Sequence, residues 1–313
     1  TWDYHCTTAG EDMHSLDVLK DIVAKRYGEP KDLKDFLRKA DLINYDGTRA
    51  MFEAFRVNIP KATGVIQWML NSAWPSLYWQ LYDSYHEPTA AYYSVKNGNQ
   101  TVQLIYNYGD HAVYAVNEGA QDAKAMATMS LYGIDGKKTT ETKSISVSPY
   151  SVEKVFDRPA FDGTGFLFLS LSDANGNHIA RNNYCLSSID DVNDWSKTTW
   201  IRTPVAKHGD FSGLNQLPKA NCTIKSATVK GHKLDITLEN ASPSVAFFIR
   251  LALKNQDGQL INPTLWEDNY ISLEPSETRM ISVDLSRAKN LTDTETLEIS
   301  GWNVPETTQT IKL

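Results

Sequence analysis

Apolar residues recur at helical spacing near the start of the chain. They lie three or four positions apart between Leu16 and Val23, as on one face of an α-helix. Ser15 is a suitable N-cap before them, and Gly28 is a suitable residue to end the pattern. The sequence therefore predicts a short helix in this region.

A second helical run extends from about residue 31 to about residue 58. Its apolar positions share the same spacing, and they are Leu33, Phe36, Leu37, Ala40, Ile43, Met51, Phe52 and Phe55. Gly47 falls inside the run and predicts a break or kink there. We expect two helical stretches in the first 60 residues.

After about residue 60 the apolar residues no longer follow a helical spacing. The run ATGVIQWML is short, apolar and β-branched at its start, and Gly64 and Asn71 bound it. This pattern is typical of a fully buried strand of a parallel sheet. The next residues are rich in aromatic side chains, and Pro75 and Pro88 exclude a simple continuous helix through them. One central strand needs neighbours on both sides, and nearby sequence offers none. We interpret residues 1–95 as the closing part of a larger α/β fold, with a small helical domain as the alternative.

From about residue 100 the pattern consists of short strand candidates separated by turn signals. The first group is TVQLIYNY, HAVYAVNE, ATMSLYG, KSISVS, GFLFLSLS and HIARNNYCLS. The second group is NCTIKSATV, HKLDITLEN, VAFFIRLALKN, TRMISVDLS and TLEISGW. Each group suits an immunoglobulin-like sandwich. The predicted fold class is multidomain and mainly β: a C-terminal remnant of a (β/α)₈ barrel in residues 1–95, one immunoglobulin-like β-sandwich in residues 96–205, and a second in residues 206–313.

Composition limits the partners. The chain has 313 residues, 41% of them hydrophobic, and a net charge of −7 with no basic run. Nucleic acid and anionic membranes are therefore poor partners, and a neutral ligand such as a sugar fits better. No apolar run approaches the ~20 residues of a membrane-spanning helix.

The cysteines and histidines suggest neither a metal nor a cofactor. Cys6, Cys185 and Cys222 are far apart, which favours three free thiols, with a bond between the last two as the exception. The seven histidines show no ligand spacing, and no phosphate-binding loop or nucleophile motif is present. We expect no cofactor and no metal.

Two segments resemble glycoside hydrolase family 2 enzymes, in particular the exo-β-D-glucosaminidase and β-mannosidase-like branch. They are RYGEPKDLKDFLRKADLINYDGTRAMFEAF and TGVIQWMLNSAWPSLYWQLYDSYHEPTAAYYSVK, and WMLNSAWPSLYWQLYD is the most specific part. LWEDNYISLEPSET and ISGWN resemble the last sandwich of the same proteins. The resemblance implies the end of the family's domain order: the last helices and strand of the barrel, then two sandwiches.

The resemblance also implies a retaining mechanism with two glutamates, an acid/base and a nucleophile, ~5–5.5 Å apart. No motif in this sequence matches either one, and both are expected upstream of Thr1. The acids of the front piece are Glu11, Asp12, Glu53 and Asp83. We interpret Glu53 as part of a solvated helix face and Asp83 as a residue that orients the aromatic loop. No catalytic residue is assigned, and the chain alone is expected to be inactive.

Three residues are predicted to bind substrate. Trp68 ends the predicted strand, and the C-terminal ends of barrel strands face the active site. In related enzymes a tryptophan at this place forms the floor of the sugar pocket, and indole suits the C–H face of a sugar. Asn71 and Trp74 follow on the loop, where Asn71 can bond a hydroxyl and Trp74 can wall a subsite. Core packing for the two tryptophans and a turn role for Asn71 are the alternatives.

Other aromatic residues are expected to be structural. Trp79, Tyr82 and Tyr85 are predicted to seal the barrel against the next domain. His5 is expected to be structural or exposed. The later tryptophans are expected to pack in cores or domain contacts, and they are Trp195, Trp200, Trp266 and Trp302.

The leading functional hypothesis is a C-terminal fragment of a retaining exo-glycosidase that hydrolyses β-linked glucosamine, as in chitosan-type glycans. The alternatives are a β-mannosidase or endo-β-mannosidase of the same family, and a non-catalytic carbohydrate-binding or structural sandwich module. The expected partners are a carbohydrate substrate, the catalytic barrel and N-terminal domains of the parent enzyme, and a second copy in a homodimer. Residues 65–70 are expected to pack on a sandwich or pair with another molecule. A secreted or periplasmic location suits a glycosidase.

Overall fold

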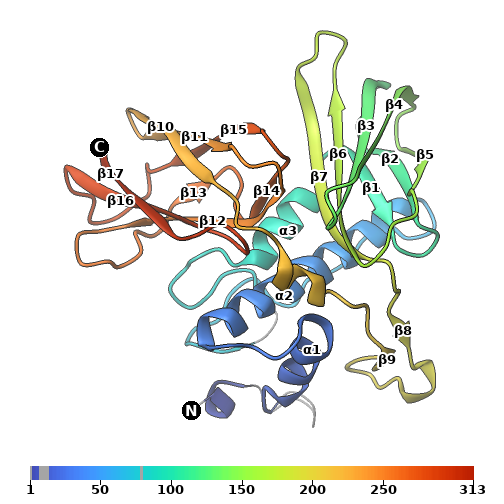
Figure 1. The fold of residues 1–313 in the computed structure, drawn as a ribbon, viewed down its shortest axis with the longest axis horizontal. Helices are drawn as coiled ribbons and strands as arrows, with labels where there is room; N and C mark the ends of the chain where they lie inside the picture. The colour runs from blue at the N-terminus through green and yellow to red at the C-terminus, as the bar shows by residue number, and fades with distance from the viewer. Residues whose placement is uncertain (1, 7–13, 78–79) are drawn as a thin grey trace. The chain divides into compact units, whose positions relative to one another are not determined.

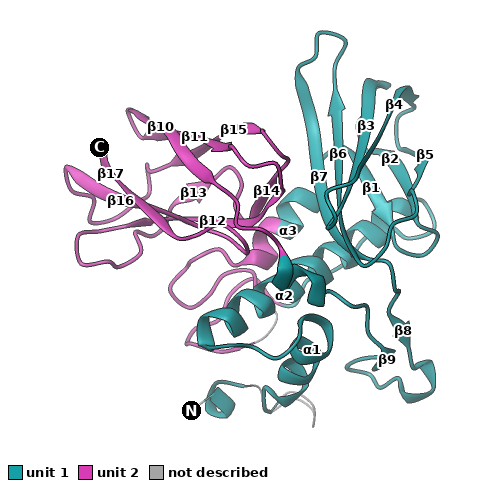
Figure 2. Ribbon diagram, viewed as in Figure 1, with its two compact units in different colours: residues 1–68, 94–216 teal, residues 69–93, 217–313 magenta. Residues whose placement is uncertain are grey.

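The structure is a computed structural model that describes residues 2–6, 14–77 and 80–313. The chain is mainly β, as predicted (Figure 1). It divides into two compact units: residues 1–68 with 94–216, and residues 69–93 with 217–313 (Figure 2). None of the described helices is long and apolar enough to cross a membrane.

Three α-helices are described: α1 (Asp17–Tyr27), α2 (Leu33–Val57) and α3 (Ala90–Gly98). Short 3₁₀ helices are η1 (Trp2–His5), η3 (Trp195–Lys197) and η4 (Ser212–Gln216). The first two α-helices confirm the helical pattern. The break expected at Gly47 is wrong, because α2 continues through it as a regular helix. The third α-helix was not predicted, since its residues follow the prolines of the aromatic loop.

Helix α2 has two unlike faces. Its N-cap Asp32 accepts a hydrogen bond from the backbone N–H of Asp35 at 2.8 Å. One face buries charged side chains: Asp35, Lys39, Arg49, Glu53 and Arg56. The opposite stripe exposes large apolar side chains: Leu33, Leu37, Met51 and Phe55 are 57%, 51%, 51% and 37% exposed. The helix thus packs through its charged face and leaves an apolar stripe uncovered.

The first unit contains a sandwich of two antiparallel sheets. Its strands are β1 (Val102–Asn107), β2 (Ala112–Asn117), β3 (Ala123–Gly133), β4 (Lys138–Val147), β5 (Ser151–Asp157), β6 (Thr164–Ser172) and β7 (His178–Ser187). One sheet has the order β1-β2-β5 and the other β4-β3-β6-β7. The core lies between them and includes Leu104 and Val113 from one sheet and Met129 and Leu167 from the other.

A two-stranded hairpin follows this sandwich in the same unit. It pairs β8 (Val192–Asn193) with β9 (Val205–Lys207), and Asp194 N–H donates to the Pro204 carbonyl at 2.8 Å. Trp195 and Trp200 lie between the two strands and are 73% and 86% exposed. Core packing is therefore wrong for these two tryptophans, because the hairpin is too small to cover an indole, whereas a contact with another domain stays a prediction.

The second unit contains the other sandwich. Its strands are β10 (Cys222–Lys230), β11 (Lys233–Asn240), β12 (Ala246–Lys254), β13 (Leu265–Trp266), β14 (Ile271–Leu273), β15 (Thr278–Asp284), β16 (Thr294–Ser300) and β17 (Thr307–Lys312). The sheets have the orders β10-β11-β15-β13 and β14-β12-β16-β17. Strand β11 alternates buried and half-buried residues, as a strand with one face on a core does. Trp266 and Trp302 are buried, as expected.

The buried strand predicted for ATGVIQWML, residues 62–70, is absent. These residues adopt irregular backbone, and Ile66, Trp68 and Leu70 are 95%, 74% and 59% exposed. The exposure of these side chains also contradicts packing of residues 65–70 on a sandwich, whereas pairing with another molecule stays a prediction. A central strand forms only when neighbouring strands satisfy both of its edges, and the described residues provide no such neighbour here.

Candidate functional site

Trp68 lies at the end of the irregular segment in the first unit. Its indole is 74% exposed, so the alternative of core packing does not describe it. An exposed indole is free to stack on a sugar face. Its role in substrate binding stays a prediction, because nothing in the described structure forms a pocket around it.

Asn71 and Trp74 lie in the second unit, on the loop that carries the aromatic residues. Asn71 is exposed and forms an isolated parallel bridge with Tyr82. Trp74 is 44% exposed, and its carbonyl accepts a hydrogen bond from Ser72 Oγ at 2.9 Å. The backbone bridge fixes the position of Asn71 and leaves its side chain available. Both residues stay predicted substrate ligands.

The predicted aromatic seam is only partly formed. Tyr82 packs on Tyr92 of α3, with ring centroids 4.9 Å apart. Tyr85 is 71% exposed, so it is not sealed within this chain, and its predicted role between the barrel and the next domain stays a prediction. The neighbouring His86 has a left-handed backbone, with a φ of 63°. Trp79 lies outside the described residues.

Asp83 organises this turn, as predicted. Its Oδ1 accepts hydrogen bonds from the backbone N–H groups of Tyr85 at 2.8 Å and Glu87 at 2.9 Å. This is the local side-chain-to-backbone pattern of an Asx turn. Asp83 is thus a structural residue of the aromatic loop.

Glu53 is not on a solvated face, and that prediction is wrong. Its side chain is 2% exposed. It accepts hydrogen bonds from Asn182 Nδ2 at 2.6 Å and from the Tyr184 hydroxyl at 2.9 Å, and its Oε2 lies 4.0 Å from Arg49 Nε. Burial raises the pKa of the Glu53 carboxyl, although Arg49 opposes the shift. Charged residues at helical spacing look the same in a sequence whether they face water or partners.

Arg49 is the centre of the same buried network. Its Nη2 lies 2.7 Å from Asp46 Oδ1, and Nη1 donates to the Asn183 carbonyl. The guanidinium also lies 4.1 Å from the centroid of the Tyr184 ring. Such a network attaches α2 to β7 of the sandwich, which makes a catalytic role for Glu53 unnecessary to explain its burial.

The remaining residues singled out in the sequence are His5, the two acids near the N-terminus and the cysteines. His5 lies in η1 and its ring contacts Tyr4, while Glu11 and Asp12 lie outside the described residues. The three cysteines are free and buried, as expected. Burial raises the pKa of the Cys185 thiol well above its ordinary value, so it is a poor nucleophile. Among the described residues no group of three metal-binding side chains comes together.

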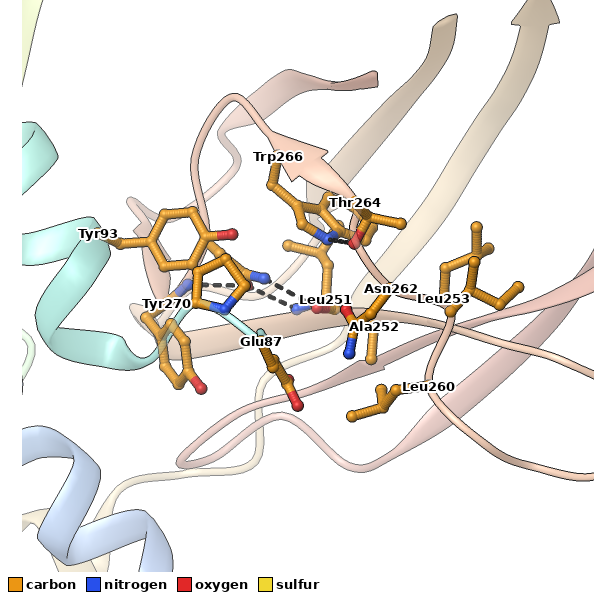
Figure 3. Close-up of a pocket in the computed structure, with 13 residues that line it drawn as sticks. Glu87, Tyr93, Leu251, Ala252, Leu253, Leu260, Asn262, Thr264, Trp266 and Tyr270 are labelled. Atoms are coloured by element: carbon orange, nitrogen blue, oxygen red, sulfur yellow. Dashed lines mark hydrogen bonds between the residues drawn. The ribbon is translucent and has the colours of Figure 1, made fainter. Parts of the chain in front are cut away.

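A small pocket in the second unit is too narrow for a sugar. Figure 3 shows Glu87 and Tyr93 on one side and Leu251, Trp266 and Tyr270 around the rest. Its free volume of about 10 Å³ is enough for one water molecule. The Trp266 indole N–H in the pocket wall donates to Thr264 Oγ1 at 3.0 Å, so it already has a hydrogen-bond partner within the protein.

A much larger cavity lies in the first unit. Its volume is about 700 Å³, and α1, α2, the β1–β2 turn and the chain after β7 line it. Its polar residues include Arg26, His111, Asp190, Asp191 and His208. Sequence reasoning missed this site, because these residues are separated by up to 182 positions and match no motif.

Comparison with known proteins covers almost the whole chain. A family model described as the exo-beta-D-glucosaminidase Ig-fold domain matches residues 200–304. The exo-β-D-glucosaminidase of Arthroderma benhamiae is 34% identical over 310 residues, which is 96% of this chain. Over almost its whole length the chain is thus similar to the C-terminal part of exo-β-D-glucosaminidases of glycoside hydrolase family 2. A mannosylglycoprotein endo-beta-mannosidase of Lilium longiflorum is also related, at 25% identity over 97% of the chain and 37% of that protein.

Solved structures agree with this family. The exo-chitosanase of Amycolatopsis orientalis, in complex with PNP-β-D-glucosamine, is 31% identical and superimposes with a TM-score of 0.89. That match covers 99% of this chain and 38% of the exo-chitosanase. A β-D-mannosidase of Dictyoglomus thermophilum shares the fold at a TM-score of 0.72 and 16% identity, over 97% of this chain and 34% of its own.

The chain spans about a third of the relatives' length. It covers 35% of the Arthroderma enzyme, and it matches the C-terminal region of these proteins. Most of each relative is therefore not represented in the 313 residues.

Proposed function

We propose that this chain supplies the C-terminal part of a retaining exo-β-D-glucosaminidase that releases β-linked glucosamine from chitosan-type glycans. The observation that carries the proposal is the structural match to an exo-chitosanase solved with PNP-β-D-glucosamine, which covers 99% of the chain. A polymeric external substrate suits a secreted or periplasmic enzyme, which we propose as its location.

The catalytic glutamates belong, in this proposal, to the two-thirds of the relatives that the chain does not span. A retaining mechanism needs two carboxyl groups ~5–5.5 Å apart. Within the described front piece, Glu53 is occupied by Asn182 and Tyr184, and Asp83 by backbone N–H groups. Neither side chain is left to protonate a leaving group or attack a sugar.

The uncovered surfaces support a barrel remnant in the first unit. The apolar stripe of α2 contains Leu37 and Met51, and the irregular segment contains Ile66 and Trp68. Barrel helices cover strands with their apolar face, and barrel strands are buried on both sides. Both surfaces are therefore the ones that the missing strands and helices of a barrel would cover.

In the complete barrel, residues 65–70 would form the last strand. Trp68 would then lie at the C-terminal end of that strand and form the floor of the sugar pocket, with Asn71 and Trp74 on the adjoining loop. The Trp68 indole would pack on the C–H face of glucosamine.

A chimeric enzyme tests the proposal. The matching C-terminal region of the Amycolatopsis exo-chitosanase is replaced by this chain, and hydrolysis of PNP-β-D-glucosaminide and PNP-β-D-mannoside is measured. We expect activity on the glucosaminide, and we expect Trp68→Ala in the chimera to lower kcat/KM by about 100-fold, because stacking and pocket shape are both lost.

The matched control is Trp195→Ala, which removes from the hairpin an indole that is 73% exposed, against 74% for Trp68. A folded chimera that is inactive on the glucosaminide, or that prefers the mannoside, would contradict the proposed substrate. Hydrolysis by the 313-residue chain alone would contradict the proposed location of the catalytic pair.

A further inference from the structure

The cavity of the first unit has two polar clusters on its wall. The first joins Tyr106, His111 and Asp190. The Tyr106 hydroxyl lies 2.8 Å from His111 Nδ1, and His111 Nε2 lies 3.2 Å from Asp190 Oδ2. The carboxylate requires a proton on Nε2, so a neutral His111 accepts from the tyrosine through Nδ1.

The backbone holds this cluster in an unusual conformation. His111 has a φ of 57°, in the left-handed region that a residue with a side chain rarely adopts. Residues kept in such conformations cluster at ligand sites, where the surrounding structure compensates their cost. The turn between β1 and β2 thus presents the imidazole to Asp190.

The second cluster joins Arg26, Asp191 and His208. Arg26 Nη1 contacts both carboxylate oxygens of Asp191 at 2.6 Å, and Gly209 N–H donates to Oδ1 at 2.8 Å. The His208 side chain is 10% exposed, and within the described structure its Nδ1 has no hydrogen-bond partner. The nearest acidic atom is Asp191 Oδ1, at 4.0 Å.

An unpartnered buried imidazole nitrogen costs free energy unless a ligand satisfies it. Burial lowers the pKa of His208, so the ring is neutral at neutral pH and does not attract an anion. The unpartnered nitrogen is suited to one hydrogen bond with a hydroxyl group. A polyhydroxylated ligand therefore satisfies His208 better than a phosphate does.

The charges of the cavity favour a cation over an anion. Of its four acidic lining residues, Asp46 and Glu53 belong to the Arg49 network and Asp191 pairs with Arg26. The fourth, Asp190, therefore offers most of the negative charge to a ligand. Asp191 already neutralises Arg26, because Arg26 Nη1 contacts both of its carboxylate oxygens. Arg158 is not among the lining residues and interacts with the Tyr106 hydroxyl of the first cluster. In the described structure Asp190 pairs with His111 and its side chain is 63% exposed, which leaves its carboxylate accessible to an ammonium group.

The cavity also offers an aromatic surface. Tyr108 lines it, is 43% exposed, and packs against Tyr106 with ring centroids 5.0 Å apart. A tyrosine ring held in this way suits the C–H face of a sugar. A volume of about 700 Å³ is in the range of small-molecule sites.

We propose that this cavity binds a protonated amino sugar. Asp190 receives the ammonium group, His208 Nδ1 bonds a hydroxyl, and the Tyr108 ring packs on the sugar face. The choice of an amino sugar over another hydroxylated cation rests on the proposed function, whose product is glucosamine. The site itself rests on the cavity and its two clusters.

Titration of the 313-residue chain with D-glucosamine at neutral pH tests the proposal, by calorimetry or saturation-transfer NMR. D-glucose is the matched probe without the ammonium group. We expect saturable millimolar binding of glucosamine and at least about tenfold weaker binding of glucose, since the charge contact is lost.

Two variants locate the site. Asp190→Asn should weaken glucosamine binding about tenfold and leave glucose binding unchanged. Gly47→Phe should abolish binding: Gly47 lines the cavity, a Cβ placed there meets nothing within 4 Å, and phenylalanine is a better helix residue than glycine. Asp257→Asn, in an exposed turn of the other unit, is the control and should change nothing.

Two results with the wild-type chain would overturn the proposal: no saturable binding of glucosamine, or equal binding of glucosamine and glucose. Unchanged glucosamine binding in both variants would also overturn it, provided that each variant retains the wild-type circular dichroism spectrum. These results are separable from failure of the proposed function. The chimera measures hydrolysis, whereas this titration needs no catalytic residue.

Discussion

Glu53 shows what a single buried charge does in this chain. It lies on the packed face of α2 with Arg49, and its two oxygens accept from Asn182 and Tyr184. A buried ion pair contributes little net free energy to folding, but removal of one partner leaves the other charge buried and uncompensated. The network therefore makes α2 sensitive to substitution at this position.

We expect Glu53→Ala to lower the free energy of unfolding of the first unit by about 3–5 kcal/mol, because Arg49 is left buried beside an empty space. Chemical denaturation followed by far-ultraviolet circular dichroism measures the change. Glu141→Ala, in the exposed strand β4, is the control and should change stability by less than about 0.5 kcal/mol. A similar loss in both variants would contradict a structural role for the network.

His208 makes stability depend on pH. Its pKa in the folded chain is below the ordinary value of 6.5, because of burial and of Arg26 and Lys25, against the opposing effect of Asp191 and Asp21. At a pH between the folded and unfolded pKa values of His208, the unfolded chain binds more protons than the folded chain does. The free energy of unfolding therefore decreases as the pH falls below 6.5.

We expect the loss of stability between about pH 7.5 and about pH 5 to be smaller in His208→Gln than in the wild type, since glutamine does not titrate. Denaturation curves at several pH values give the slopes. Equal slopes for the two proteins would show that His208 keeps its ordinary pKa.

Helices and strands with a clear spacing of apolar residues were predictable from the sequence. Elements that form only beside particular neighbouring strands were not. Residues 17–27 and 33–57 form helices because the apolar spacing and Asp32 specify them locally. Most strands of both sandwiches were also found. The short strands β13 and β14 have three residues or fewer, so no alternation is visible in them.

The predicted strand at residues 62–70 shows the opposite case. Its sequence is that of a buried strand, but burial requires other strands, which the described chain does not place beside it. The cavity was missed for a similar reason. His111 and Asp190 meet only after the sandwich forms, and no spacing in the sequence relates them. Trp68 was predicted from resemblance and its role is still untested.

Gly47 offers a prediction about α2. It lies inside a regular helix with open space around its Cα, so Gly47→Ala should raise the free energy of unfolding by about 0.5–1 kcal/mol through helix propensity. Gly136→Ala is the control: Gly136 has a φ of 82°, and the same substitution there should be destabilising. Circular dichroism melting curves compare the two, and a lower melting temperature for Gly47→Ala would indicate that α2 is not regular at this position.

At the scale of the whole molecule, two apolar surfaces of the described chain are uncovered. The stripe of α2 and residues 66–70 both lie in water, and such patches mark interaction surfaces. In the proposed parent enzyme a barrel covers them, and the isolated chain has no such cover.

We therefore expect the isolated chain to self-associate, and Ile66→Lys combined with Met51→Glu to reduce this association at least several-fold. Size-exclusion chromatography with light scattering measures the molar mass. Met280→Lys, at a 57% exposed position of the second unit, is the control and should leave association unchanged. A wild-type chain that is monomeric at high concentration would show that these surfaces do not attract each other.

The distribution of tryptophans decides what fluorescence can report about this chain. In the described part of the first unit every indole is at least 38% exposed, whereas Trp266 and Trp302 of the second unit are 5% and 7% exposed. An emission shift on denaturation therefore follows the second sandwich and is nearly blind to the first. Accessibility to a soluble quencher instead reports the exposed indoles, which include Trp2, Trp68, Trp195 and Trp200 of the first unit and Trp74 of the second. Loss of quenching is therefore an optical signal that a partner has covered these exposed residues.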